Sequence, residues 1–99
     1  TPYYRLVYVY LKNHNEALLD QMAVVMADKL RAVFGNRVLG PDKPPVARIQ
    51  TLFIKKIVVK IEQNAPMGRA RELLLRIQRE MIEDERYKSL IVYYDVDPM

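Results

Sequence analysis

The stretch FIKKIVVKIEQ, residues 53–63, decides the fold, because its apolar and basic side chains alternate along the chain. In an extended strand, one side would carry Ile57, Val59 and Ile61, and the other would carry Lys56, Val58 and Lys60. Such alternation is typical of a strand with one buried face and one solvated face. The sequence therefore predicts a sheet with a basic, solvated face.

The residues before this strand supply its neighbours. Val46 to Gln50 is predicted to be the other arm of a hairpin that turns at Thr51-Leu52. Lys43-Pro44-Pro45 lacks two backbone donors and predicts a stiff, extended connector. Arg37 to Leu39 can form a short strand, which we expect Gly40-Pro41 to end.

Two further strands lie near the ends of the chain. Residues 3–11, YYRLVYVYL, are rich in aromatic and β-branched side chains on both faces, which predicts an interior position in the sheet. Residues 89–96 predict the final strand.

A first helix is predicted from Asn15 to Phe34, where apolar residues recur at helical spacing. Asn13 and Glu16 have the spacing of a capping box, so we expect Asn13 to be the N-cap. Gly35 is the expected C-cap.

A second helix is predicted to begin near Pro66, a residue suited to a first turn. Glu72 and Arg76 are expected to form an i,i+4 pair on its exposed side. Its buried stripe is expected to contain Ala70, Leu73, Leu74, Ile77, Met81 and Ile82.

The predicted order β-α-β-β-α-β indicates an α+β fold, the ferredoxin-like split β-α-β sandwich, with an antiparallel sheet and two helices on one face. The 99 residues suffice for a single domain, residues 1–99. The absence of cysteine excludes disulfides and cysteine-based zinc sites. No apolar stretch approaches the roughly 20 residues that span a bilayer. Because the chain starts at Thr1, almost inside its first strand, we expect a piece of a larger protein.

The net charge of +4 is concentrated in residues 36–63, which carry six cations against two anions. Clustered lysine and arginine attract polyanions such as phosphate backbones or acidic peptides. A solubilising face is an equally good interpretation of so small a charge.

Catalytic and metal sites have little support. The one histidine, His14, lies in a predicted capping loop and is expected to be a surface residue. Asp95 and Asp97 could hold Mg²⁺ or Ca²⁺ but lack an evident third ligand, so we expect them to cap a turn or pair with an arginine.

The seven tyrosines allow a second interpretation. The same topology supports the RNA-recognition module, in which aromatic residues of the first and third strands stack on bases, and Tyr4, Tyr8 and Tyr10 suit the first strand. The third strand lacks the glycine-aromatic signature of that module. A tyrosine surface packed against a neighbouring domain is the simpler explanation.

Three segments together resemble a known family. They are Arg5-Leu6-Val7 with Leu11-Lys12, Val38-Leu39-Gly40-Pro41 with Pro44-Pro45-Val46-Ala47-Arg48, and Asp95-Val96-Asp97-Pro98. Over essentially the whole chain, the sequence is similar to the C-terminal domain of the primosomal protein N′ (PriA) family, whose members are bacterial DNA helicases of replication restart.

The resemblance implies that the parent protein is a cytoplasmic, ATP-dependent 3′-to-5′ helicase acting on stalled forks and D-loops. It implies that ATP, Mg and Zn bind in other domains of the parent, so that this monomeric, non-catalytic domain needs no cofactor. The expected partners are forked or single-stranded DNA, the acidic tail of single-stranded DNA-binding protein, and other domains of the helicase chain, with no membrane.

The resemblance also suggests which residues bind. The hairpin of the family is basic and aromatic, and Arg48, Phe53, Lys55, Lys56 and Lys60 match that character, although Leu52 and Ile54 stand where arginines are common. Early in the second helix, Arg69 and Arg71 are expected to contact the acidic tail. The alternatives are a free-standing RNA- or ribosome-associated ferredoxin-like module and, with no site residues to support it, a regulatory domain of an enzyme.

Overall fold

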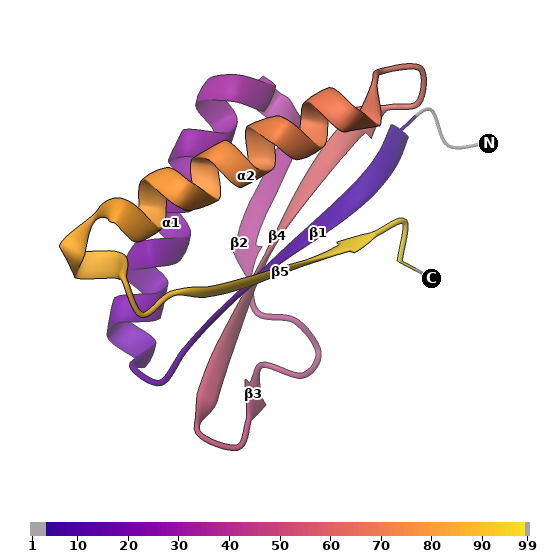
Figure 1. The fold of residues 1–99 in the computed structure, drawn as a ribbon. Coiled ribbons are helices and arrows are strands. Elements are labelled where there is room, and N and C mark those ends of the chain that lie inside the picture. Colours follow the sequence, from indigo (N-terminus) through magenta and orange to yellow (C-terminus); the bar gives the residue numbers. More distant parts are fainter. Residues whose placement is uncertain (1–3, 99) are drawn as a thin grey trace.

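A computed structural model describes residues 4–98 of the chain (Figure 1). Five strands, two α-helices and two short 3₁₀ helices follow in the order β1 (Tyr4–Asn13), α1 (Glu16–Phe34), η1 (Gly35–Arg37), β2 (Val38–Asp42), β3 (Arg48–Ile49), β4 (Leu52–Glu62), α2 (Met67–Glu83), η2 (Glu85–Tyr87) and β5 (Ile91–Val96). Tyr3, where we expected the first strand to begin, lies outside the described residues.

The sheet confirms the predicted fold. Its strands lie in the order β2-β4-β1-β5, every neighbouring pair is antiparallel, and the short β3 pairs with β4. With β3 counted as a continuation of β2, this is the ferredoxin-like arrangement. The prediction that β1 is interior is confirmed, because it lies between β4 and β5.

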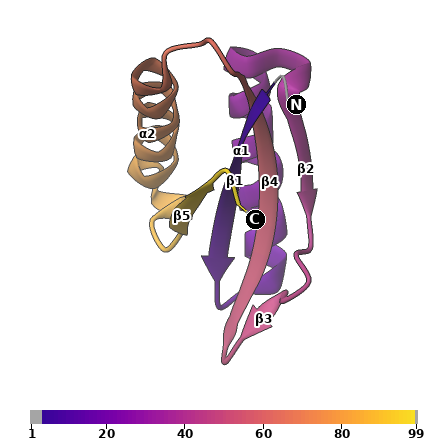
Figure 2. The ribbon, with the colours of Figure 1, turned by 90° about the vertical axis from the view of Figure 1, so that its right-hand side faces the viewer.

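One face of the sheet forms the core. Both helices contribute to the same buried cluster as the strands, and Figure 2 shows β1 and β4 in front of α1 with no helix on their other side. The strands contribute Val7, Val9, Leu11, Val38, Ile57, Val59 and Ile61, and the helices contribute Leu19, Met22, Ala23, Met26, Ala27, Leu30, Ala70, Leu74, Ile77 and Met81. The predicted stripe of α2 is confirmed except that Leu73 and Ile82 are only half-buried.

The predicted cap of α1 is wrong by two residues. Asn15 is the N-cap, and its side-chain oxygen accepts a hydrogen bond from the Leu18 N–H at 3.0 Å. Asn13 instead continues the covered face of β1, where it is 5% exposed and its Nδ2 donates to the Oγ and carbonyl oxygen of Ser89. Gly35 ends α1 as predicted, with a φ of 66° and its N–H bonded to the Arg31 carbonyl.

Gly40-Pro41 does not end β2, contrary to the prediction. The β2–β4 register shifts between Leu39 and Asp42, so the strand bulges and continues. Gly40 has a φ of +102°, and a Cβ there would lie 2.9 Å from the Lys56 carbonyl oxygen. Both the backbone conformation and the close approach require glycine at this position.

Three smaller predictions need adjustment. The hairpin turns at Gln50-Thr51, one residue earlier than expected, because Ile49 pairs with Leu52. Pro66 precedes α2 as its N-cap instead of lying in the first turn. Among the described ion pairs Glu72 pairs with Arg69, with the two side chains 3.3 Å apart, and the expected pair with Arg76 is not formed.

Candidate nucleic-acid interface

The structure divides the five residues predicted to contact DNA between two faces of the sheet. Phe53 and Lys55 lie on the side of the helices, where Phe53 packs against the core and the Lys55 ammonium is 3.1 Å from Asp20 of α1. Lys55 is consequently only 17% exposed at its side chain. Lys56 and Lys60 lie on the opposite face, because neighbouring residues of a strand alternate.

Arg48 belongs to the hairpin at the end of β4. Its guanidinium lies 5.0 Å from the centre of the Phe53 ring. Arg48 is in β3, which Figure 1 shows at the end of the sheet beyond β2. Arg48 and Phe53 thus form one small basic and aromatic surface, separate from Lys56 and Lys60.

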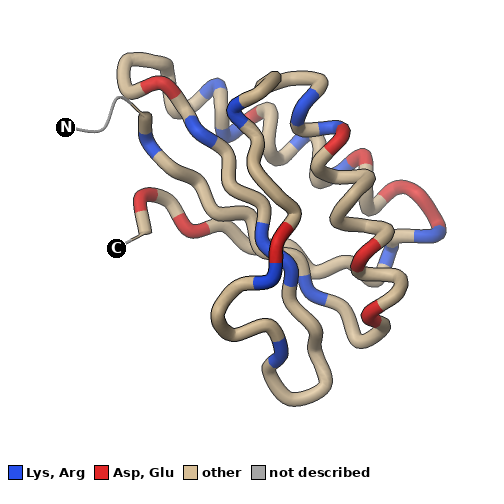
Figure 3. The backbone as a smooth tube through the Cα atoms, turned by 180° about the vertical axis from the view of Figure 1, so that it is seen from behind, with Lys and Arg blue, Asp and Glu red and all other residues tan. Residues whose placement is uncertain are grey.

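The open face, which is the side of the sheet turned away from the helices, is the richer candidate. Strand register places Tyr10 between Tyr93 of β5 and Lys56 of β4, and it places Tyr8 between Asp95 and Val58. Lys12 occupies the next position along β1, between Ile91 and Ile54. Figure 3 shows several Lys and Arg stretches near the middle of the molecule.

Three rings on this face form a run that we name the tyrosine ladder, Tyr93, Tyr10 and Tyr8. The Tyr10 and Tyr93 rings are stacked, with centres 4.7 Å apart and planes inclined by 12°. The Tyr8 ring meets Tyr10 edge-on, with a centre-to-centre distance of 6.3 Å. Offset and edge-on arrangements are the favourable ones for aromatic pairs.

A lysine covers each end of the tyrosine ladder. The Lys12 ammonium lies 4.5 Å from the centre of the Tyr93 ring, and the Lys56 ammonium lies 4.4 Å from the centre of the Tyr8 ring. Lys60 lies 5.7 Å from the ring of Tyr4 farther along β1. These distances are within the range of cation–π attraction.

The phenols of Tyr10 and Tyr93 remain neutral at physiological pH. Burial, followed by the proximity of Tyr93, raises the pKa of Tyr10 above its ordinary value. Burial and the charge of Asp95 likewise raise the pKa of Tyr93. These two rings therefore add no negative charge that would repel a phosphate.

Acidic groups border the open face. Asp95 lies beside Tyr8, Asp42 lies beside Lys56, and Glu62 lies beside Tyr4. Glu62 is neutralised by an ion pair with Arg37. Lys12, Lys56 and Lys60 thus share the open face with Asp42 and Asp95 at its borders.

Tyr8 and Tyr10 were predicted only for the RNA-recognition alternative, and Lys12 and Tyr93 were not among the predicted site residues. Lys12 could have been found, because Tyr8, Tyr10 and Lys12 recur at the period of a strand. Tyr93 requires knowledge of the β1–β5 register, and residue spacing alone does not provide it.

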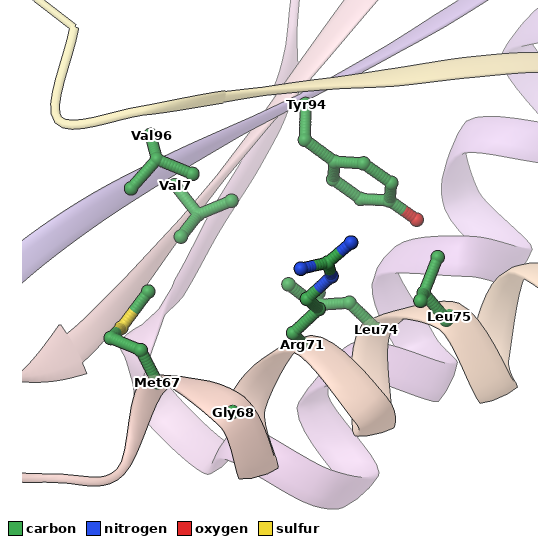
Figure 4. A pocket seen from close by; sticks show the side chains of 8 residues that line it. All are labelled: Val7, Met67, Gly68, Arg71, Leu74, Leu75, Tyr94 and Val96. Atoms are coloured by element: carbon green, nitrogen blue, oxygen red, sulfur yellow. The ribbon is translucent and has the colours of Figure 1, made fainter.

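The two arginines predicted to bind an acidic tail lie in different hollows. Arg71 lines a groove of about 430 Å³ whose apolar wall is formed by α2 and β5, with Met67, Leu74, Leu75, Tyr94 and Val96 (Figure 4). Arg69 pairs with Glu72 and borders a separate hollow near Arg37 and Lys60. Burial raises the pKa of Tyr94 to about 12, and its hydroxyl donates to Gln78 Oε1 at 2.7 Å.

The C-terminal aspartate pairs with an arginine, one of the two expected roles. Asp97 has a φ of 50°, so its carboxylate turns back toward β1, where it accepts hydrogen bonds from Arg5 Nε at 2.9 Å and from the Leu6 N–H at 3.1 Å. These bonds hold the pKa of Asp97 below its usual range, with the Arg5 hydrogen bond the largest cause. Among residues 4–98, no three His, Asp or Glu side chains gather to hold a metal ion.

His14 is exposed, as predicted, and its Nδ1 lies 3.0 Å from Thr51 Oγ1. It therefore joins the start of α1 to the turn of the hairpin. Neither α1 nor α2 combines the length and the apolar character needed to cross a membrane.

Comparison with known proteins supports the fold alone. No protein-family model matches the sequence, and no curated protein matches it. Among solved structures, the chain is similar to a de novo designed protein, Foldit4, with a TM-score of 0.66, 11% sequence identity, and coverage of 97% of this chain and 98% of that chain. At such an identity the shared feature is the two-layer α+β architecture.

Proposed function

We propose that this chain is a non-catalytic DNA-binding domain whose open face binds branched or single-stranded DNA. The observation that carries the proposal is the pairing of each open-face lysine, Lys12, Lys56 and Lys60, with a tyrosine ring. Lysines neutralise phosphates with release of counterions, while aromatic rings offer stacking surfaces that tolerate any base. The open face of the sheet presents no helix to the major groove, so binding is selective for DNA structure and not for sequence.

The parent protein that we propose is a replication-restart helicase of the primosomal protein N′ (PriA) type, located in the cytoplasm. The support is the order of the three motif segments, and two of their residues have clear structural duties. Gly40 makes the bulge of β2, and Asp97 ties the end of β5 to β1. Gly40 and Asp97 thus support the fold, while Lys12 of the first segment is one of the lysines of the open face.

The test is a charge-neutralising pair of substitutions, Lys12→Gln with Lys56→Gln. If each lysine contacts one phosphate, the slope of log K against log salt for single-stranded DNA should become shallower by about 1.4. The control is Lys29→Gln with Lys88→Gln, which removes the same charge from lysines that pair with Glu80 and Glu85 away from the open face. Equal losses in both variants would mean that net charge alone binds DNA, and a clear preference for structured RNA would favour the RNA-associated module instead.

A second function, binding of the acidic tail of single-stranded DNA-binding protein, has its own support. Arg71 stands beside an apolar groove, and this combination suits a peptide with acidic groups and an apolar side chain (Figure 4). Arg69, which already has a carboxylate partner, is the weaker candidate.

Binding of such a peptide should fall about tenfold in Arg71→Glu, as expected for a lost hydrogen bond between charged groups. Arg79→Glu is the matched control, because Arg79 is on the same helix but does not line the groove. Fluorescence anisotropy of a labelled peptide measures both, and equal losses would remove the groove from consideration.

A further inference from the structure

The tyrosine ladder has two ends, and each end is covered by a flexible cation. Lys12 covers the outer ring, Tyr93, which is 39% exposed, and Lys56 covers Tyr8. Tyr10 lies between these rings and contacts both. Further ligand rings can therefore stack on the ladder only at its two ends.

We propose that these two ends are stacking positions for unpaired bases of single-stranded DNA, and that Lys12 and Lys56 are the covers that a base displaces. The inference rests on the proposed function and specifies its ligand as a strand with unstacked bases. A lysine over an exposed ring contributes less than a stacked base does, so a base replaces the ammonium group. The released ammonium group then pairs with a phosphate of the same strand, so that the cation is used in both states.

The position of the ladder favours a single strand. Its rings come from β1 and from β5, and β5 lies at the edge of the described sheet, so the Tyr93 end opens beside the rim. Bases inside a duplex are stacked on one another and cannot reach these rings. A single strand can cross from β5 to β4 by way of Tyr93, Tyr10 and Lys56, which lie side by side in the strand register.

The test compares two ligands of the same length and charge, an oligothymidylate of about 12 nucleotides, a length within known single-strand site sizes, and the same backbone without bases. Tyr93→Val should lower the affinity for the oligothymidylate about tenfold, the effect of losing one stacked base. It should leave the affinity for the abasic strand unchanged. Tyr93→Phe, which retains the ring, should bind both ligands as the original chain does.

Tyr8→Val tests the other end of the ladder independently, so the inference stays testable if one variant folds poorly. Tyr87→Phe is the control away from the open face, because Tyr87 is 2% exposed and belongs to the core. This variant should bind as the original chain does. The chain has seven tyrosines and no tryptophan, so quenching of tyrosine fluorescence by the oligothymidylate alone gives a second reading.

The outcomes separate the two proposals. The stacking positions would be overturned if Tyr93→Val lowered the affinity for both ligands equally. They would also be overturned if neither Tyr93→Val nor Tyr8→Val lowered the affinity for either ligand. Both outcomes would leave charge-driven binding intact. Failure of the original chain to bind either strand at low salt would overturn the DNA-binding function itself. An oligouridylate bound more tightly than the oligothymidylate would overturn the assignment of DNA as the ligand.

Discussion

The covered and open faces of the sheet are built from the same strands and differ in nearly every property. On β1, Val7, Val9 and Leu11 are fully buried under the helices, while Tyr8, Tyr10 and Lys12 between them form the open face. The covered face is apolar and excludes water, whereas the open face combines rings with cations. Stability and binding are therefore assigned to alternate residues of one strand, and substitutions at neighbouring positions can separate them.

The largest expected difference between the faces concerns leucine truncation on β1. Leu11 is 0% exposed, so Leu11→Ala should lower the free energy of unfolding by about 3 kcal/mol through lost burial and the cavity left behind. Leu6 is only half-buried on the open face, and Leu6→Ala should cost about 1 kcal/mol. Urea denaturation measures both, and similar midpoints would contradict the distinction between the faces.

Asn13 is the one buried polar side chain among the described residues, and its substitution tests what that side chain contributes to stability. Asn13→Ala should cost about 2 kcal/mol, because the buried Asn13 side chain loses its hydrogen bonds to Ser89 and to the Asn15 N–H. Asn15→Ala removes only the exposed cap of α1 and should cost about 1 kcal/mol. If Asn15→Ala proved the more damaging of the two, the exposed helix cap would contribute more than the hydrogen bonds of the buried Asn13 side chain.

Much of this division could be predicted from the sequence. The alternation in residues 53–63 and the helical spacing in α1 and α2 give the element order, and the topology rules then leave the ferredoxin-like arrangement. The separation of Lys55 from Lys56 also follows from strand alternation, so grouping them in one DNA site was an avoidable error.

The remaining features depend on contacts distant in sequence. Asn13 and Asn15 are both good caps by residue type, and only the packing of β1 against Ser89 selects Asn15. Gly40-Pro41 reads locally as the end of a strand, but pairing with β4 carries β2 past it. The tyrosine ladder needs the register of β1 with β5, which joins residues more than 80 positions apart in the chain. Local propensity is a weak guide wherever tertiary pairing decides the outcome.

Lys55 and Lys56 allow the comparison to be made with adjacent lysines. Lys56→Glu should lower the affinity for single-stranded DNA by about fivefold, or about 1 kcal/mol, because a cation of the open face is replaced by an anion. Lys55→Glu should leave that affinity nearer the original value but reduce stability by less than about 1 kcal/mol, since it breaks the ion pair with Asp20. Anisotropy titrations measure the DNA affinity of both variants, and urea midpoints measure their stability.

The smallest expected effect is a pH dependence of stability at the end of β5, the rim where the two faces meet. Asp97 holds the end of β5, the strand of Tyr93, against β1 through the Arg5 side chain and the backbone of Leu6. Because its folded-state pKa lies below the unfolded value, its contribution is present above about pH 4, the ordinary pKa of aspartate, and is lost as the pH falls through the folded-state pKa. Asp97→Asn should therefore be slightly less stable than the original chain at neutral pH, and the two should converge in acid.

Asp84, whose pKa is lowered to about 2 by the hydrogen bond from Arg86, is the control at the end of α2. The stabilisation by Asp84 should likewise be lost as the pH falls from about 4 to about 2, and Asp84→Asn should not change the DNA affinity at neutral pH. Urea midpoints that stay equally far apart at every pH would show that Asp97 acts through shape and not through charge.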